Sequence, residues 1–168
     1  LAGSLGVDMT DLSTATGLMA NAGVKGSRAG TSLKNVLSNM ASPTDKQAAA
    51  LQKLGLTADE TGSYLKTNAD GNVDLAATMK SLMTATEGMD KTQQAAILTQ
   101  IAGKEAIAGL MSIMNQGEAA WDELSTTIEN STGKVQYWNE CMSLAGKSGS
   151  EAVKLIDNMK QVFSEVES

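Results

Sequence analysis

Apolar residues recur along this chain at intervals of three and four, and short glycine-containing breaks interrupt the pattern. The first stretch of this kind carries Leu12, Ala15, Met19 and Ala22. Such intervals place side chains on one face of an α-helix. The chain has one proline in 168 residues and little Val or Ile, which disfavours strands and leaves helices unbroken. We therefore predict an all-α fold, a compact multi-helix bundle of short amphipathic helices with Gly-rich corners.

Capping residues predict where each helix begins and ends. The expected helices lie between these markers: Asp8 or Thr10 to Gly23, Ser27 to Pro43, Thr44 to Gly55, Asp74 onward, Asp90 to Gly103, and Ile107 through a break at Gly117 to residues 131–134. Thr44 with Gln47 has the spacing of a capping box. Residues 56–73 leave three alternatives open, namely a loop, a short helix capped by Thr57 and Glu60, or a small hairpin.

The predicted core consists of small and flexible side chains. Ten Met and many Ala stand against one Phe, two Trp and two Tyr. Helices with such side chains can pack at close range, and they specify their partners less rigidly than aromatic cores do.

Charge and hydropathy exclude two classes of partner. The formal net charge of −6 provides no basic surface for nucleic-acid phosphates, so we expect no specific nucleic-acid binding. No run approaches the roughly 18 apolar residues of a membrane-spanning helix, so we expect no membrane span in this fragment. Because the first residue is Leu1, within an apparent structural element, we expect the chain to be a fragment of a larger protein.

The sequence lacks the residues that most catalytic and metal sites need. There is no His, and the single Cys141 can build neither a disulfide scaffold nor an all-cysteine metal site. The Gly-Lys-Ser at 146–148 has Cys141 where a phosphate-binding loop needs glycine. A calcium loop centred on Gly71 would place Lys66 and Ala77 at ligand positions. We expect no enzyme, no cofactor and no metal.

Residues 17–35 contain four glycines, and two of them punctuate two helical patterns. The Gly23-x-x-Gly26 connection permits positive φ and a sharp reversal of the chain. Ala29, Gly30 and Leu33 share a face of the following helix. Because glycine inside a helix costs about 1 kcal/mol relative to alanine, Gly30 predicts a tight helix crossing, within the domain or between subunits. The stretch is therefore a helix–helix corner rather than a phosphate loop.

The C-terminal part has a different pattern. Its apolar positions follow a heptad spacing, over Ala152, Leu155, Met159, Val162 and Val166, after a hinge at 146–150. Two heptads also fit an amphipathic helix that folds back on the body. We therefore expect two regions, a core helical domain at 1–133 and trailing helices at 134–168, which either pack on the body or project toward a longer rod.

The same glycine-rich stretch resembles the N-terminal signature of phage tail tape-measure proteins. The matching positions are Leu5-Gly6, Ala22-Gly23-Val24-Lys25-Gly26-Ser27, Ala29-Gly30-Thr31, Leu33 and Pro43, followed by residues 51–56, 70–75 and 101–128. Within the last segment, Gly103 and Lys104 stand for the family's Phe-Gly-Lys, with Ala102 in place of the aromatic residue. The match covers about residues 1–135 in one collinear order.

The resemblance implies a non-catalytic virion structural protein that sets tail length, acting in tail assembly and genome delivery. It implies self-association within the tail lumen, and contact with the tail tube protein, the tail assembly chaperones and the distal tail proteins. The protein would be found in the virion tail, and in the host bacterial cytoplasm during assembly. The motif residues Gly23, Lys25, Gly26, Ala29, Gly30, Leu33, Gly103 and Lys104 would shape helix corners and packing.

Two other hypotheses stay open. One is a helical adaptor or chaperone-like module, which would need an exposed apolar groove for a partner helix. The other is an envelope-active enzyme, because tape-measure proteins sometimes carry a peptidoglycan-cleaving domain. No acid pair or metal set in this sequence marks such a site.

Overall fold

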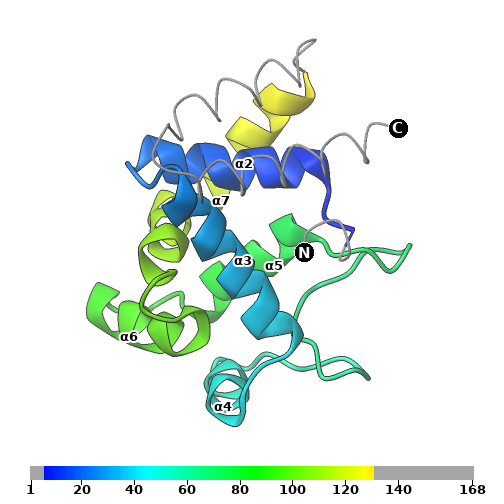
Figure 1. The fold of residues 1–168 in the computed structure, drawn as a ribbon, viewed down its shortest axis with the longest axis vertical. Coiled ribbons are helices and arrows are strands. Elements are labelled where there is room, and N and C mark those ends of the chain that lie inside the picture. Colours follow the sequence, from blue (N-terminus) through cyan, green and yellow to red (C-terminus); the bar gives the residue numbers. More distant parts are fainter. Residues whose placement is uncertain (1–5, 131–168) are drawn as a thin grey trace.

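The computed structural model describes residues 6–130 and shows an arrangement of helices around one core (Figure 1). The helices are α2 (Met9–Asn21), α3 (Ser27–Ala41), α4 (Asp45–Lys53), α5 (Leu75–Ala85), α6 (Lys91–Ala102) and α7 (Ile107–Glu129). These residues contain no strand, and the nearest feature is an isolated antiparallel bridge between Thr67 and Val73. The all-α prediction is confirmed.

Local hydrogen bonds explain where the helices begin. Asp8, rather than Thr10, caps α2, because its Oδ1 accepts a hydrogen bond of 2.7 Å from the Thr10 backbone N–H. The capping box of Thr44 and Gln47 forms at α4 as predicted, and Asp90 forms a second one with Gln93 at α6. Each of these helix starts depends on residues no more than three positions apart.

Helix α2 lies at the centre and departs from the predicted amphipathic pattern. It packs against α3, α5 and α7, and its side chains are buried on every face. Polar side chains survive there because they bond to their own helix: Thr14 Oγ1 donates to the Thr10 carbonyl at 2.7 Å, and Thr16 Oγ1 donates to the Leu12 carbonyl at 2.8 Å. Ala22, expected on the apolar face, is exposed because the helix ends at Asn21.

Residues 56–73 form a loop with tight turns. The alternative of a helix capped by Thr57 is wrong, because Asp59 instead accepts hydrogen bonds from the backbone N–H groups of Thr61 and Ser63, at 2.8 and 3.1 Å. Asn68 closes the second turn in the same way, accepting from Asp70 and Asn72. Asx turns of this kind stabilise a reversal of the chain, so the local backbone hydrogen bonds are met without a helix.

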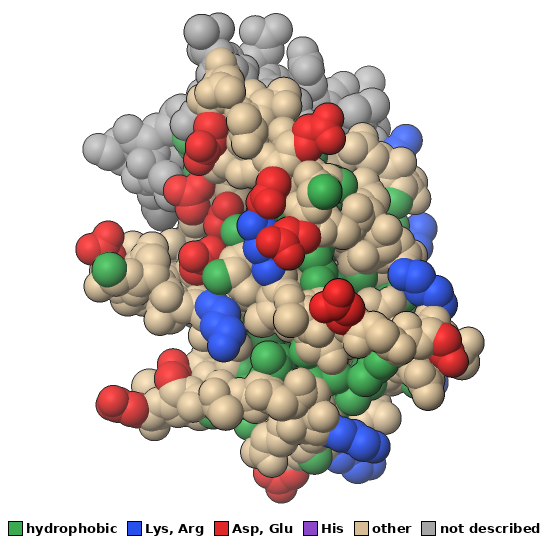
Figure 2. Space-filling view, turned by 180° about the vertical axis from the view of Figure 1, so that it is seen from behind, with side chains coloured by type: hydrophobic (Ala, Val, Ile, Leu, Met, Phe, Trp, Pro, Cys, Tyr) green, Lys and Arg blue, Asp and Glu red, His purple; other side chains and the backbone are tan. Residues whose placement is uncertain are grey.

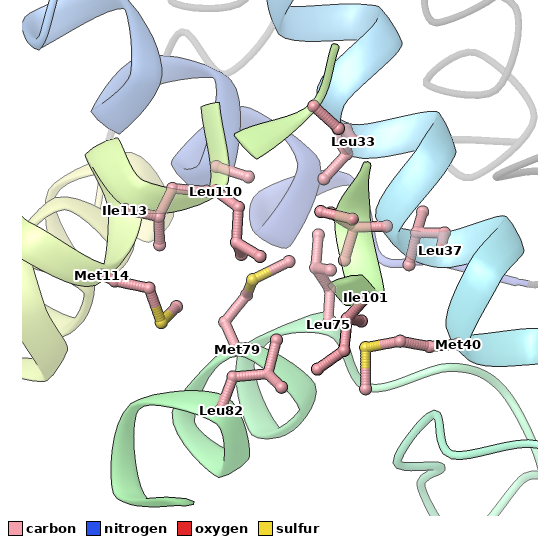
Figure 3. Packing of buried hydrophobic residues seen from close by; sticks show 14 of the residues in the cluster. Leu33, Leu37, Met40, Leu75, Met79, Leu82, Ile101, Leu110, Ile113 and Met114 are labelled. Atoms are coloured by element: carbon pink, nitrogen blue, oxygen red, sulfur yellow. The ribbon is translucent and has the colours of Figure 1, made fainter. Parts of the chain in front are cut away.

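The core between α3, α5 and α7 is built from Leu, Ile and Met side chains (Figure 3). Met79 of α5 extends between Leu75 and Leu110, and Met40 reaches the same cluster from the end of α3. Met79 and Met40 are 1% and 0% exposed. Flexible thioethers fill the irregular space between crossing helices, as the composition predicts.

A break at Gly117 shapes the C-terminal part of the described residues. Gly117 has φ 85° and ψ 178°, which bends α7 where a break was predicted.

None of the helices within residues 6–130 combines the length and the hydrophobicity that a membrane crossing requires. The predicted boundary at 133–134, the hinge and the heptad helix lie outside the described residues.

Candidate functional site

The first motif corner joins α2 to α3 through two glycines with positive φ. Gly23 has φ 85° and Gly26 has φ 62°, so the predicted reversal is confirmed. Backbone bonds close the turn, with the Val24 N–H donating to the Met19 carbonyl at 2.8 Å. Gly26 is the N-cap of α3 and supplies no side chain, while Lys25 between the glycines is exposed. The corner is held by these backbone hydrogen bonds and by the Val24 side chain, which is buried in the core.

The motif residues after this corner divide between the core and the solvent. Ala29, Gly30 and Leu33 are buried on the inner face of α3, and Ala29 is 3% exposed. The tight crossing predicted at Gly30 stays a prediction. On the outer face of the same helix lie Arg28 and Lys34, both exposed.

The second motif corner, between α6 and α7, is held by a side chain. Gly103 has φ 89°, and its N–H donates to the Thr99 carbonyl at 2.8 Å. Asn39 of α3 donates from Nδ2 to the Ile101 carbonyl at 2.9 Å, which satisfies a helix-end carbonyl that has no partner within α6. Lys104 is exposed, whereas Ala102 is 1% exposed. The Asn39 side chain therefore holds this corner against α3.

The two corners do not meet in one site. The first lies at the start of α3 and the second lies beside Asn39, twelve residues further along the helix. Since an α-helix rises about 1.5 Å per residue, about 18 Å of helix separates them. The motif residues thus lie near the two ends of one helix, and they do not converge on one site.

A close approach between helices lies at Gly109, which is not among the predicted packing residues. Gly109 in α7 is buried, and a Cβ at this position would overlap the side chain of Ser32 in α3. The same Cβ would lie 3.0 Å from Met19 Sδ of α2. Three helices therefore meet at one residue without a side chain. The signal was present in the sequence, because Gly109 sits inside a helical pattern where glycine is unfavourable.

A second glycine connects two of the motif segments. Gly6 has φ 70°, and a Cβ there would overlap Asn72 of the 56–73 loop. The Leu-Gly opening and the segment 70–75 therefore lie against each other, although they are far apart in the sequence. This contact gives a packing reason for glycine at position 6.

A partly buried carboxylate joins α2 to the start of α5. Asp11 Oδ2 accepts a hydrogen bond of 3.2 Å from the Ala76 backbone N–H. The pKa of Asp11 is raised to about 6, chiefly by burial and also by the neighbouring charges of Asp8, Asp74 and Glu129, although the hydrogen bond from Ala76 lowers it. At neutral pH this junction therefore holds a desolvated negative charge.

Two features of the described surface bear on its chemistry, namely clusters of metal-ligating side chains and hollows. Within residues 6–130, no three His, Cys, Asp or Glu side chains gather where they could hold a metal ion. The hollows found are open ones. One of them measures about 580 Å³, and its lining includes Leu54, Leu56, Ala77, Lys66 and Lys80. Its walls also carry Glu118, whose carboxylate lies 3.9 Å from Lys80 Nζ, so the charges present form a surface ion pair.

The geometry is that of a helical scaffold with glycine-marked corners, and a comparison with known proteins identifies its family. The family described as "Phage-related minor tail protein" matches residues 1–103. The matched residues include the first motif corner, α3 and the end of α6 at Gly103.

The chain belongs to the phage-related minor tail protein family.

The chain is also similar to the tape measure protein of Pneumococcus phage Dp-1. The two are 30% identical over 150 residues, which is 88% of this chain and 12% of that protein. The chain thus spans about an eighth of the length of this relative. No solved structure matches it significantly. The predicted resemblance to tail tape-measure proteins is confirmed.

Proposed function

We propose that this minor tail protein chain is the folded head of a longer tape-measure protein, which sets the length of a phage tail. The observation that carries the proposal is the alignment with a tape measure protein over 88% of this chain and only 12% of that protein. A compact helical region within a much longer chain fits this relation. The division into a core at 1–133 and trailing helices at 134–168 belongs to the same proposal.

The partners follow from the position of such a protein in the tail. We propose self-association of several copies in the tail lumen, and contacts with the tail tube protein, the tail assembly chaperones and the distal tail proteins. The protein would assemble in the host cytoplasm and remain in the virion. Its acidic net charge of −6 would keep it from adhering to DNA in the same lumen.

We further propose that this chain is not itself catalytic. Membership of a tail structural family supports this, and the motif glycines act through backbone geometry and packing rather than through reactive groups. A peptidoglycan-cleaving activity would need a pair of carboxyl groups at a defined separation flanking a sugar cleft. Absence of turnover by the purified chain on peptidoglycan is the expected result.

The first experiment is mass spectrometry of tail particles purified from the phage or prophage that encodes this chain. Peptides of residues 6–130, found together with peptides of a long helical continuation, are expected from a tape measure. Particles that form normally but contain no peptide of the chain would contradict the proposal.

One observation favours a helical adaptor as the second candidate. The open groove of about 580 Å³ between α4 and α5 exposes part of Leu54 and Leu56 beside Lys66 and Lys80, which would suit an amphipathic partner helix. An adaptor would act before or outside the particle. If the chain is an adaptor, it is therefore expected in cells during tail assembly and absent from finished tails.

A further inference from the structure

The outer face of α3 is basic in a chain that is otherwise acidic. Between Leu12 and Thr44 there is no Asp or Glu, while Lys25, Arg28 and Lys34 are all exposed. The positions between them on this face carry short neutral side chains, namely Thr31, Asn35 and Ser38. We call this surface, with Lys25, Arg28 and Lys34, the basic face. Among the described residues none of its three cations forms an ion pair.

The second half of α7 has the opposite character. Glu118, Asp122, Glu123 and Glu129 are exposed, and α7 contains no Lys or Arg. Glu118, Asp122 and Glu129 lie in line along the helix, since spacings of four and seven return to one side. Lys80 of α5 bonds to Asp122 at 2.6 Å and lies 3.9 Å from Glu118, which neutralises one of the four charges. We call these four carboxylates the acidic face.

The two faces lie on opposite sides of the molecule. Helix α3 crosses the front in Figure 1, whereas the second half of α7 passes behind α2. Figure 2, the view from behind, shows acidic side chains gathered on the upper half of that side, with a basic group between them. One copy of the chain therefore cannot join its own basic face to its own acidic face.

The two faces carry similar numbers of charges. Along α3, residues 28 and 34 span about 9 Å, and along α7, residues 118 and 129 span about 16 Å, taking the helical rise of about 1.5 Å per residue. Lys25 extends the basic face into the connection before α3. Three positive charges thus face a stripe with a net charge of −3 once Lys80 is counted. The small side chains of Thr31 and Ser38 allow a partner helix to approach the basic face closely.

We propose that copies of this chain associate head to tail, with the basic face of one copy against the acidic face of the next. A contact between two different faces of one molecule is heterologous, so it generates a ring where the rotation closes and a filament where it does not. The inference rests on the proposed function for its place in the tail, where copies would be held together.

The contact is expected to be weak in solution. Exposed ion pairs each contribute little, and salt screens them over a distance of about 10 Å at 0.1 M and about 3 Å at 1 M. Copies that are tethered together in one particle would meet at a far higher effective concentration. A test must therefore trap transient contacts rather than isolate a stable complex.

The experiment mixes unlabelled and ¹⁵N-labelled forms of the 168-residue chain and treats them with a carbodiimide, which joins lysine amines to carboxylates. At low salt, mass spectrometry is expected to find mixed-isotope peptides that join Lys25 or Lys34 to carboxylates of residues 118–129. The yield is expected to fall at least fivefold in 0.5 M salt, because the attraction is electrostatic.

Matched variants separate this interface from net charge. Arg28→Glu removes no lysine from the basic face, and it is expected to lower the mixed-isotope yield about fivefold. Lys53→Glu makes the same charge change on exposed α4, and it is expected to leave the yield unchanged. Two results would overturn the inference. One is an equal loss of mixed-isotope yield in both variants. The other is that α7 carboxylates are linked as often to Lys46 and Lys53 as to Lys25 and Lys34. If tails contain the chain but no mixed-isotope product forms, the proposed interface is wrong while the proposed function stands.

Discussion

Glycine has different roles in two regions of the molecule, the helix contacts around α2 and the corners at the periphery. At the centre, Gly109 has no room for a side chain because Ser32 and Met19 occupy the space. At the outer corners, Gly23 and Gly103 have open space around the position of a Cβ, and only their positive φ demands glycine. Glycine therefore encodes close packing in the interior and chain reversal at the surface.

The same contrast holds for charge. Asp11 lies partly buried at the junction of α2 and α5, with its pKa raised to about 6. Lys80 lies near the surface on α5, where the hydrogen bond that its Nζ donates to Asp122 raises its pKa above the usual value. Substitutions near α2 should thus have large and specific effects, whereas substitutions at the corners and the surface should have small ones.

The largest effect is expected for Gly109→Ala. The added Cβ overlaps Ser32, and overpacking of this kind should outweigh the helix propensity of alanine and lower the free energy of unfolding by about 3 kcal/mol. Urea denaturation followed by circular dichroism measures this. The double variant Gly109→Ala with Ser32→Gly should recover part of the loss. Purely additive effects would show that the two residues do not meet.

Asp11→Asn tests the partly buried charge. In the unfolded chain this carboxyl titrates near 3.8 and in the fold near 6, so the fold favours the protonated form. Its contribution to stability is therefore complete below pH 4 and is lost as the pH rises through 6. The amide keeps an acceptor for the Ala76 N–H without a charge. After allowance for solvent screening, we expect the variant to gain about 1–2 kcal/mol at pH 7.5 and almost nothing at pH 4.

The check is a pair of urea titrations at each pH, because comparing the two proteins at one pH removes the contributions that they share. A difference between wild type and Asp11→Asn that stays constant from pH 4 to 7.5 would rule out the raised pKa.

Gly23→Ala and Gly103→Ala test the corners. Each forces an L-residue to a positive φ of 85° or 89° in open space, which should cost about 1 kcal/mol without any clash. Thermal unfolding of the two variants should show similar small decreases in Tm. A loss as large as that of Gly109→Ala would mean that the corners are also tightly packed, and the contrast between interior and periphery would disappear.

The smallest effect is expected for Lys80→Gln. The ion pair with Asp122 is short, at 2.6 Å, but the Asp122 side chain is 56% exposed. Such pairs contribute about 0.2–1 kcal/mol and are screened by salt. Chemical denaturation by urea in 0.05 and 1 M NaCl should show a small difference that vanishes at high salt. A difference that persists would show that the Lys80 stem contributes by packing.

Local features of the fold could be predicted from the sequence. The capping boxes at Thr44 and Asp90 connect residues three positions apart, so their pattern is visible in the chain itself. The positive φ at Gly23 and Gly26 was predictable for the same reason. These features require no knowledge of which helices cross.

The long-range contacts could not be predicted. The Asp11–Ala76 bond spans 65 residues and forms only because α2 lies against the start of α5. The burial of α2 on every face was also missed, because Thr14 and Thr16 look polar in sequence and satisfy their hydroxyls within the helix. The close approach at Gly109 was not predicted either, while the crossing expected at Gly30 stays a prediction. Crossing points depend on the relative placement of helices, which periodicity does not specify.

The central claim is that this helical head belongs to a protein whose length sets the tail. Its most direct test is an in-frame deletion in the long helical part of the full-length protein, outside the segment that matches this chain, followed by electron microscopy of the tails. We predict that tails shorten by about 1.5 Å for each residue removed, the rise of an α-helix. Tails of unchanged length that still contain the shortened protein would contradict the account.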